Sequence, residues 1–371
     1  MIFFLAFFIL SSYAAIFGVI LLVGWINQQA SEKSRFRGAI TPNMITVIVP
    51  FRNEEKRIEG LLKSISLSKA LPAHFLFLND HSSDKSAEVI AQRLVGFPIT
   101  IIDLPNEIQG KKQAIKYGVS LVKTAFVLTL DADVTFSDTY FNAFTNLGSA
   151  DLYILPVIMK ATSWQQHCFE FDTLSLHALN AGISGVARPI VASGANLLFS
   201  KSCFDECSRY VQHVHIASGD DMYLLKDFRA EKNRILLSTD NALGVETETP
   251  QSWKEFFHQR IRWIAKSRDV NDHFANVIAL VQIIFSVSFL FLFIFLLLSS
   301  NLNLLVLSIF TKGFLDMLFY APYFLRTGHP FHLFFIPVYQ LLLPVYQFLI
   351  LLAATFVKPN WKGRPVGIKK A

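Results

Sequence analysis

The stretch of sequence that decides the fold lies at residues 125–133 and reads AFVLTLDAD. Its first six residues are mostly apolar, which is typical of a strand buried on both faces of a parallel sheet. Asp131 and Asp133 follow directly, two residues apart, at the end of this strand. Two carboxylates at that spacing can share one divalent cation, Mg²⁺ or Mn²⁺. Taken alone, the segment could equally be a solvated turn, where Asp is common.

Strand patterns and helical patterns alternate on the N-terminal side of this stretch. In chain order, they occupy residues 44–51, 54–67, 73–78, 84–94, 99–104 and 111–121. This alternation predicts an α/β domain with a mostly parallel sheet and helices on both of its faces. In such sheets ligands bind outside the carboxyl ends of the strands. We therefore expect the site at residues 50–54, 79–84 and 131–133.

The composition indicates a membrane protein. Of the 371 residues 52% are hydrophobic and 17% are charged, against about 25% charged in a typical soluble domain. Runs without Asp, Glu, Lys or Arg cover residues 1–26, 274–311 and 327–357. Each run is long enough for a membrane-spanning helix, which needs about 20 residues. The first run lacks the basic start of a cleaved signal peptide, so we expect a retained anchor.

The distribution of charge argues against a nucleic-acid partner. The formal net charge is +6, and the residues from Lys312 onward account for all of it. The polar middle of the chain, residues 27–273, is therefore neutral overall and lacks the basic surface that phosphate-backbone binding requires. Three cysteines, Cys168, Cys203 and Cys207, are too few for a disulfide framework, and we expect them to be reduced.

Three further polar segments carry residues suited to chemistry. Asp80 could accept hydrogen bonds from a base or a ribose, and Lys111 at a helix start suits a phosphate-bearing ligand, although a solvated lysine is the alternative. Of Asp220 and Asp221, we expect one to cap a helix and the other to be a candidate general base. The stretch 253–268 combines an apolar stripe with basic residues, which predicts a helix lying on the membrane surface.

Together these segments resemble membrane-bound family-two glycosyltransferases with the GT-A fold. The segments that match are VIVPFRNEE (47–55), NDHSSD (79–84), GKKQA (110–114), DAD (131–133, D-x-D), SGANLLFSKSCF (193–204), SGDD (218–221) and QRIRW (259–263, Q-x-x-R-W). They occur in the family's order and span roughly residues 44–268. The resemblance implies a nucleotide-sugar donor and a metal-dependent hexosyltransferase.

The resemblance also implies roles for individual residues. Donor binding would involve Pro50, Arg52, Glu54, Asp80, Lys111 and Asp131. Asp133, with Asp131, would hold Mg²⁺ or Mn²⁺, and Asp221 would be the base, with Asp220 as the alternative. Gln259, Arg262 and Trp263 would close the donor diphosphate and acceptor site. Two departures, Asn79 for an acid and His81 for a glycine, suggest a nucleoside pocket of different shape.

We therefore expect inverting transfer from a nucleotide-sugar, by analogy a UDP-sugar, to a lipid or lipid-linked acceptor. A processive polysaccharide synthase is the nearest alternative, although about three C-terminal hydrophobic runs are few for a monomer that must enclose a channel. A catalytically inactive membrane scaffold or a transporter is the alternative from another class. Acids at positions 133 and 221 argue against the scaffold, and the scarcity of charges in the hydrophobic runs argues against the transporter.

The expected domains are an anchor at 1–26, a catalytic domain at 27–273 that ends in an interfacial helix (251–268), and a C-terminal membrane region with a basic tail at 274–371. The basic residues Lys33, Arg35 and Arg37 predict that the catalytic domain is cytoplasmic. We expect the protein itself to be anchored in the inner membrane of a bacterium. The tail is basic too, so an even number of crossings should follow Arg268. Pro337 and Pro344 interrupt the last run, and we expect residues 331–357 to form a bent or re-entrant hairpin.

Overall fold

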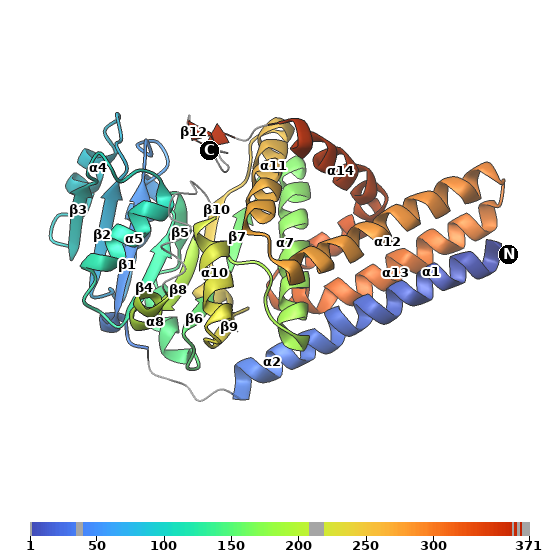
Figure 1. Cartoon of the computed structure of the whole chain (residues 1–371), viewed down its shortest axis with the longest axis horizontal. Coiled ribbons are helices and arrows are strands. Elements are labelled where there is room, and N and C mark those ends of the chain that lie inside the picture. The colour runs from blue at the N-terminus through green and yellow to red at the C-terminus, as the bar shows by residue number, and fades with distance from the viewer. Residues whose placement is uncertain (1, 35–39, 208–218, 358–359, 362–363, 366–371) are drawn as a thin grey trace. The chain divides into compact units, whose positions relative to one another are not determined.

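A computed structural model describes residues 2–34, 40–207, 219–357, 360–361 and 364–365 (Figure 1). The chain divides into two compact units. The sheet unit comprises Glu32–Lys160, Val191–Thr249 and Trp361–Ala371, and the helical unit comprises Met1–Ser31, Ala161–Ile190 and Pro250–Asn360. Arg35 and Arg37, Ser218 and most of the basic tail lie outside the described residues.

A seven-stranded sheet forms the centre of the sheet unit, in the order β3-β2-β1-β4-β8-β6-β9. The strands are Ile45–Phe51 (β1), His74–Asn79 (β2), Ile99–Asp103 (β3), Phe126–Leu130 (β4), Leu152–Ile154 (β6), Asn196–Ser200 (β8) and Ile235–Leu237 (β9). Only the two pairings made by β8 are antiparallel, and the other four are parallel. The predicted mostly parallel sheet is confirmed.

Helices and a small second sheet complete the sheet unit. The helices are Glu59–Leu67 (α3), Ser86–Arg93 (α4), Lys111–Leu121 (α5), Tyr140–Ala143 (α6), Lys201–Glu206 (α8) and Asp220–Ala230 (α10). The small sheet has the order β5-β10-β7 and consists of Val134–Phe136 (β5), Val157–Lys160 (β7) and Val245–Glu248 (β10). Single 3₁₀ turns lie at Pro42–Met44, Phe144–Asn146 and Asn241–Leu243, and two short strands at Asn360–Trp361 (β11) and Arg364–Pro365 (β12).

Two helix starts differ from the sequence prediction. Helix α3 begins at Glu59 rather than at residue 54, because the amide of Glu54 donates to Ser86 Oγ (2.8 Å) and residues 55–58 form a turn. Helix α10 takes Gly219 as its N-cap, with a φ of 88°. The expectation that Asp220 or Asp221 is the N-cap residue is therefore wrong, because these two acids are the first two residues of the helix.

The helical unit contains the membrane-spanning candidates. Its elements are Ile2–Gly18 (α1), a π-helical segment Val19–Val23 (η1), Gly24–Ser34 (α2), Trp164–Val186 (α7), Trp253–Val270 (α11), His273–Leu298 (α12), Leu302–Arg326 (α13), the 3₁₀ segment Pro330–Phe335 (η5) and Ile336–Phe356 (α14). Within the described residues, three helical stretches are long and apolar enough to cross a membrane: Phe3–Glu32, His273–Leu298 and Leu302–Arg326. They match the predicted N-terminal span and two of the predicted C-terminal spans as candidates.

The third C-terminal run is bent. Its two helical parts, Pro330–Tyr339 and Leu341–Ala354, meet at 73°, which fits either a broken span or a re-entrant loop. The prediction of a bend in residues 331–357 is confirmed. Proline explains part of it, because Pro344 lies inside α14 and cannot donate a helix hydrogen bond.

A polar contact joins the spanning helices to one another. Lys312 and Asp316 pair one turn apart on α13, and the hydroxyl of Tyr13 on α1 donates to Asp316 Oδ1 (2.5 Å). The Lys312 ammonium also lies 5.0 Å from the ring centroid of Phe289 on α12. The three helices α1, α12 and α13 run side by side (Figure 1). Charged groups between such helices are stabilised by pairing of this kind, since water cannot solvate them.

Glycines let the N-terminal helix approach α7 closely. A Cβ on Gly185 would lie 1.8 Å from the backbone oxygen of Gly24, and a Cβ on Gly24 would lie 2.0 Å from the backbone oxygen of Gly182. Backbone contact of this kind is typical of membrane helices with small residues at their interface. The π-helical segment η1 immediately precedes Gly24.

We predict that Gly185→Ala lowers the thermal unfolding midpoint of the protein in detergent. The added methyl group meets backbone atoms that cannot rotate away, and overpacking of this kind costs about 1–3 kcal/mol. The matched control is Gly18→Ala, where the nearest atom to the new Cβ is at 3.5 Å, an ordinary contact with Phe319. Equal midpoints for both variants would contradict the proposed close helix contact.

Candidate active site

The predicted site residues of the sheet unit lie where three parallel strands end. Pro50 is the last residue but one of β1, Asp80 follows β2, and Asp131 follows β4. The ends of β1 and β2 are level, because Phe51 pairs with Asn79, and β4 ends two residues before β1, because Ile48 pairs with Thr129. The register thus brings the polar clusters that follow these strands to one edge of the sheet, as predicted.

Lys111 connects two of the predicted acids. Its ammonium lies 2.5 Å from Asp131 Oδ1 and 3.7 Å from Asp220 Oδ2. Burial alone would lower the pKa of Lys111, but the carboxylates of Asp131 and Asp220 raise it above its ordinary value. Lys111 is the first residue of α5, as predicted. A lysine in this environment stays protonated and provides a fixed positive charge at the strand ends.

Gly194 allows this arrangement. A Cβ on this residue would lie 2.5 Å from Asp220 Oδ2 and 3.1 Å from Lys111 Nζ. Any larger residue would therefore push the carboxylate or the ammonium aside. The amide of Gly194 also donates to Asp221 Oδ2 (3.0 Å), and the amide of Met222 donates to Asp221 Oδ1 (2.6 Å). Both oxygens of Asp221 are thereby held in a fixed orientation.

Asp133 lies among charged groups of both signs. Arg57, which the sequence analysis missed, contacts Glu54 Oε2 at 2.6 Å and Asp133 Oδ2 at 3.6 Å. Burial and the negative charges of Asp131 and Glu54 raise the pKa of Asp133 to about 6, and Arg57 offsets part of this effect. The only signal for Arg57 in the sequence is its position three residues after Glu54. The crowding leaves an excess of negative charge that a cation would relieve.

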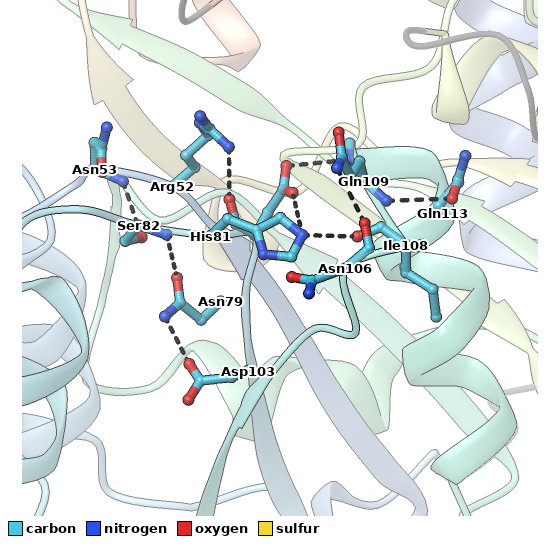
Figure 2. A network of polar contacts seen from close by, with 12 residues as sticks. Arg52, Asn53, Asn79, His81, Ser82, Asp103, Asn106, Ile108, Gln109 and Gln113 are labelled. Carbon is cyan, nitrogen blue, oxygen red and sulfur yellow. Dashed lines mark hydrogen bonds and ion pairs between the residues drawn. The ribbon is translucent and has the colours of Figure 1, made fainter.

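Asp80 is held by backbone contacts. It is 2% exposed, and its Oδ2 accepts the amide hydrogen of Gly110 (3.1 Å), which directly precedes Lys111. Arg52 Nη1 donates to the backbone oxygen of Asp80 (3.0 Å), as Figure 2 shows. The segments after β1 and β2 are thus tied to the start of α5.

The structure explains the two departures from the family pattern. His81 has a φ of 57°, the left-handed region that favours glycine, and its Nε2 lies 3.2 Å from the backbone oxygen of Ile108 (Figure 2). Asn79 accepts the Ser82 amide hydrogen (2.9 Å) and donates to Asp103 Oδ1 (2.7 Å). Here a histidine occupies the glycine position and contacts the neighbouring loop with its ring.

The Q-x-x-R-W segment lies on α11 of the helical unit. Its most buried cation is Arg260 rather than Arg262, and Arg260 donates to Asp172 Oδ2 (2.6 Å) and Thr173 Oγ1 (2.7 Å). Gln259 Oε1 accepts from Arg260 Nη1 (3.3 Å), and the Arg260 guanidinium lies 4.1 Å from the Trp263 ring centroid. Two predicted site residues of this motif therefore contact Arg260, which the sequence analysis did not single out. Their predicted role at the diphosphate and acceptor stays a prediction.

Comparison with known proteins supports the class of fold. Residues 46–153 match the model of the family described as Glycosyl transferase family 2. The mannosyltransferase PcManGT from Pyrobaculum calidifontis, solved with GDP-Man and Mn²⁺, superimposes with a TM-score of 0.56 over 92% of this chain and 99% of that one, at 16% sequence identity. The protein thus has a GT-A-like glycosyltransferase fold, and the resemblance drawn from the motifs is confirmed.

A curated relative matches only part of the sequence. The 4,4'-diaponeurosporenoate glycosyltransferase of Staphylococcus aureus (strain USA300) is 36% identical over 96 residues. This match covers 25% of the present chain and spans only 24% of the relative's length. The same match occurs with the proteins of that name from other strains of the species, among them NCTC 8325.

We predict that Asp133→Asn stabilises the protein at pH 7.5 in a chelator. A carboxyl group with a pKa raised from 3.8 to about 6 destabilises the folded state when it is ionised, and this effect disappears as the pH falls from about 6 to about 4. The amide of Asn removes the charge, so the unfolding midpoint should rise by the equivalent of about 1 kcal/mol at pH 7.5, by about half as much at pH 5, and by almost nothing below about pH 4. A midpoint below that of the wild type at pH 7.5 would contradict the charge crowding described above.

Proposed function

We propose that the protein is an inverting glycosyltransferase that moves a sugar from a nucleotide-sugar to a lipid or lipid-linked acceptor. The observation that carries this proposal is the set of acids and one lysine at the carboxyl ends of β1, β2 and β4. Asp131, Asp133 and Lys111 lie there together, on a fold shared with a mannosyltransferase. This is the edge at which sheets of this topology bind their ligands.

The residues at this edge suit a divalent metal. Asp133 and Asp131 offer carboxylate oxygens, the ligands that Mg²⁺ and Mn²⁺ prefer. Burial, together with the negative charges of Asp131 and Glu54, raises the pKa of Asp133, and a bound cation would favour its ionised form. A metal held by these two residues would stabilise the negative charge that develops on the leaving diphosphate.

Lys111 supplies the second positive charge of the site. We infer that its ammonium binds diphosphate oxygens, because it is fixed at the start of α5 between Asp131 and Asp220. Preorganised charges of this kind act most strongly on groups whose charge grows during the reaction. Asp220 then positions Lys111.

Asp221 is our proposed general base. Its carboxylate is oriented by the amides of Gly194 and Met222, and orientation is what a base needs in order to take the proton from an acceptor hydroxyl. That hydroxyl would attack the anomeric carbon on the face opposite the departing diphosphate, so the configuration of the sugar inverts. Asp220 is the alternative base.

The nucleoside pocket is proposed around Pro50, Arg52, Glu54 and Asp80. Asp80 is held rigidly by Gly110, and Glu54 by Ser86 and Arg57. We propose a UDP-sugar as donor and keep GDP-sugars as the second class to be tested, since PcManGT was solved with GDP-Man. The His81 ring lies beside Ile108, and the nucleoside of the donor must fit next to this side chain.

The acceptor is proposed to be lipid-like because the chain has three helices apolar enough to cross a membrane. The protein would then sit in the inner membrane of a bacterium with the sheet unit in the cytoplasm. The S. aureus relative carries the name of a glycosyltransferase for 4,4'-diaponeurosporenoate. A lipophilic acceptor is consistent with that name.

The proposal is tested with the full chain in membranes, incubated with radiolabelled UDP-sugars and GDP-sugars, a lipid extract, and Mn²⁺ or Mg²⁺. We expect label in the organic phase with one donor, and loss of this label in EDTA and in Asp133→Ala. Asp205→Ala removes a more exposed acid of the same unit and should leave transfer intact. Long water-soluble polymer would instead indicate a polysaccharide synthase, and no transfer with any donor would overturn the proposal.

We predict that Asp221→Asn lowers transfer by at least ~10²-fold, because the amide keeps the shape of the side chain but cannot accept the proton. Binding of the donor, measured by equilibrium dialysis with the labelled nucleotide-sugar, should survive. The matched variant is Asp220→Asn on the same helix turn. If Asp220→Asn is the inactive variant and Asp221→Asn is active, the two roles are exchanged.

The basic tail is expected on the same side of the membrane as the sheet unit. We predict that a cysteine introduced as Ala371→Cys, in a chain whose native cysteines are replaced by serine, resists an impermeant maleimide in intact bacterial cells. Positive charge near spans favours the cytoplasmic side, and permeabilised cells provide the control for reactivity. Rapid labelling of intact cells would mean that residues 331–357 cross the membrane fully.

A further inference from the structure

Two histidines and a glutamate meet in the helical unit, away from the residues discussed above. His167 and Glu170 lie one turn apart on α7, and His332 lies in η5, between α13 and α14. His167 Nδ1 is 3.0 Å and His332 Nε2 is 2.8 Å from the same oxygen, Glu170 Oε2. One ligand atom from each of the three residues lies within 4.8 Å of the others.

A fourth potential ligand lies beside this trio. His329 Nε2 is 3.8 Å from Glu170 Oε1, and its other ring nitrogen, Nδ1, is 3.3 Å from Thr327 Oγ1. A partner on the second nitrogen is the usual way in which a metal-binding histidine is oriented. We call these four residues, His167, Glu170, His329 and His332, the His–Glu cluster.

His332 is the residue that points to a missing ligand. It is 3% exposed, and neither of its ring nitrogens makes a hydrogen bond to a described residue. The close approach of Nε2 to Glu170 lacks the direction that an N–H donor needs. A buried ring nitrogen without a hydrogen bond costs free energy, and a cation bound at Nε2 would remove this cost at that atom.

The surroundings of the His–Glu cluster suit a metal ion. The ring centroids of Phe335, Phe324 and Phe171 lie 5.9, 6.4 and 6.5 Å from that of His332. An apolar shell of this kind excludes water and strengthens bonds between charged ligands and a cation. Aromatic side chains cannot themselves compete for the metal.

We propose that the His–Glu cluster binds Zn²⁺ through His167 Nδ1, Glu170 and His332 Nε2, with His329 or water as the fourth ligand. Imidazole and carboxylate together are typical zinc ligands, and four-coordinate zinc with bonds of about 2.0–2.1 Å separates its ligands by about 3.3 Å. The observed 2.8 and 3.0 Å require a small outward movement of the ring nitrogens from Glu170 Oε2, and the two ring nitrogens lie within 4.8 Å of each other. The ion would link α7 to the connection between α13 and α14. The zinc site is therefore structural, and it is independent of the sugar transfer proposed above.

The test measures zinc in the full chain, purified in detergent without a histidine tag. All variants carry Asp133→Ala, so that the carboxylates of the sheet unit do not contribute. After weakly bound metal is removed, we expect about one zinc per chain, as a closed structural site holds. Replacement by Co²⁺ should give the intense visible absorption of a four-coordinate site, and addition of Zn²⁺ to the metal-free protein should raise its Tm.

Two variants and one control decide the assignment. His332→Gln and Glu170→Gln should weaken zinc binding by more than the roughly 10- to 100-fold that loss of an outer-shell partner costs, and should abolish the rise in Tm. His273→Gln, an exposed histidine of the same unit, should bind zinc as before. Zinc retained in both cluster variants, or no four-coordinate cobalt spectrum in the chain with an intact cluster, would overturn the proposal. Neither outcome depends on whether sugar transfer is found.

Discussion

The site depends on the parallel pairing of β1 with both β2 and β4. The strand order β3-β2-β1-β4 reverses direction at β1, so the segments that leave β1 and β4 diverge and leave room between them. Glu54 and Arg57 enter this space from the β1 side, and Asp131 and Asp133 enter it from the β4 side. A shift of one residue in the register of either pair would turn these side chains to the other face of the sheet. The buried faces of all three strands oppose such a shift.

The acids that lie at this edge of the sheet lower the stability of the folded protein. Burial, and then repulsion from Asp131 and Glu54, raise the pKa of Asp133. Arg57, which contacts Glu54 and Asp133, and Lys111, which pairs with Asp131, compensate part of the repulsion among these acids. Residues that bind a substrate often lower the stability of the free protein in this way. The remaining negative charge is what makes this edge suitable for a cation and its phosphate ligand.

Sequence reasoning predicts the first half of the sheet unit well, because buried strands and amphipathic helices each leave a periodic pattern within a few residues. Helix α5 begins and ends as predicted. The start of α3 differs from the prediction because the amide of Glu54 donates to Ser86 Oγ, which lies far along the chain. This contact keeps Glu54 outside the helix. Arg57 was missed for the same reason. Arg57 contacts Asp133, which lies far away in the sequence. A local sequence pattern does not show which distant residues come together in the fold.

Helix α7 was not predicted at all, and its physical character explains why. Five of its thirteen buried residues are polar, namely Gln166, Glu170, Thr173, Ser175 and Asn180, so it shows no clean apolar stripe. Buried polar residues need partners. Glu170 contacts His332 in η5, while Asp172 pairs with Arg260 of α11 and accepts the hydrogen bond of the Tyr339 hydroxyl on α14 (2.5 Å).

These contacts fix the register of α7 more strictly than apolar packing would. If α7 slid by one turn, Glu170 would lose its contact with His332, and Arg260 would be left buried without its carboxylate. An uncompensated buried charge costs several kcal/mol. The glycines at the other end of the helix add a steric limit, since only Gly182 and Gly185 admit the backbone of the N-terminal helix. Apolar side chains tolerate a slide because one methyl group can replace another as a neighbour. Helix α7 therefore has a single register, because paired charges hold one half of it and backbone contacts at glycines hold the other. The same pairing allows its polar side chains to be buried inside the helical unit.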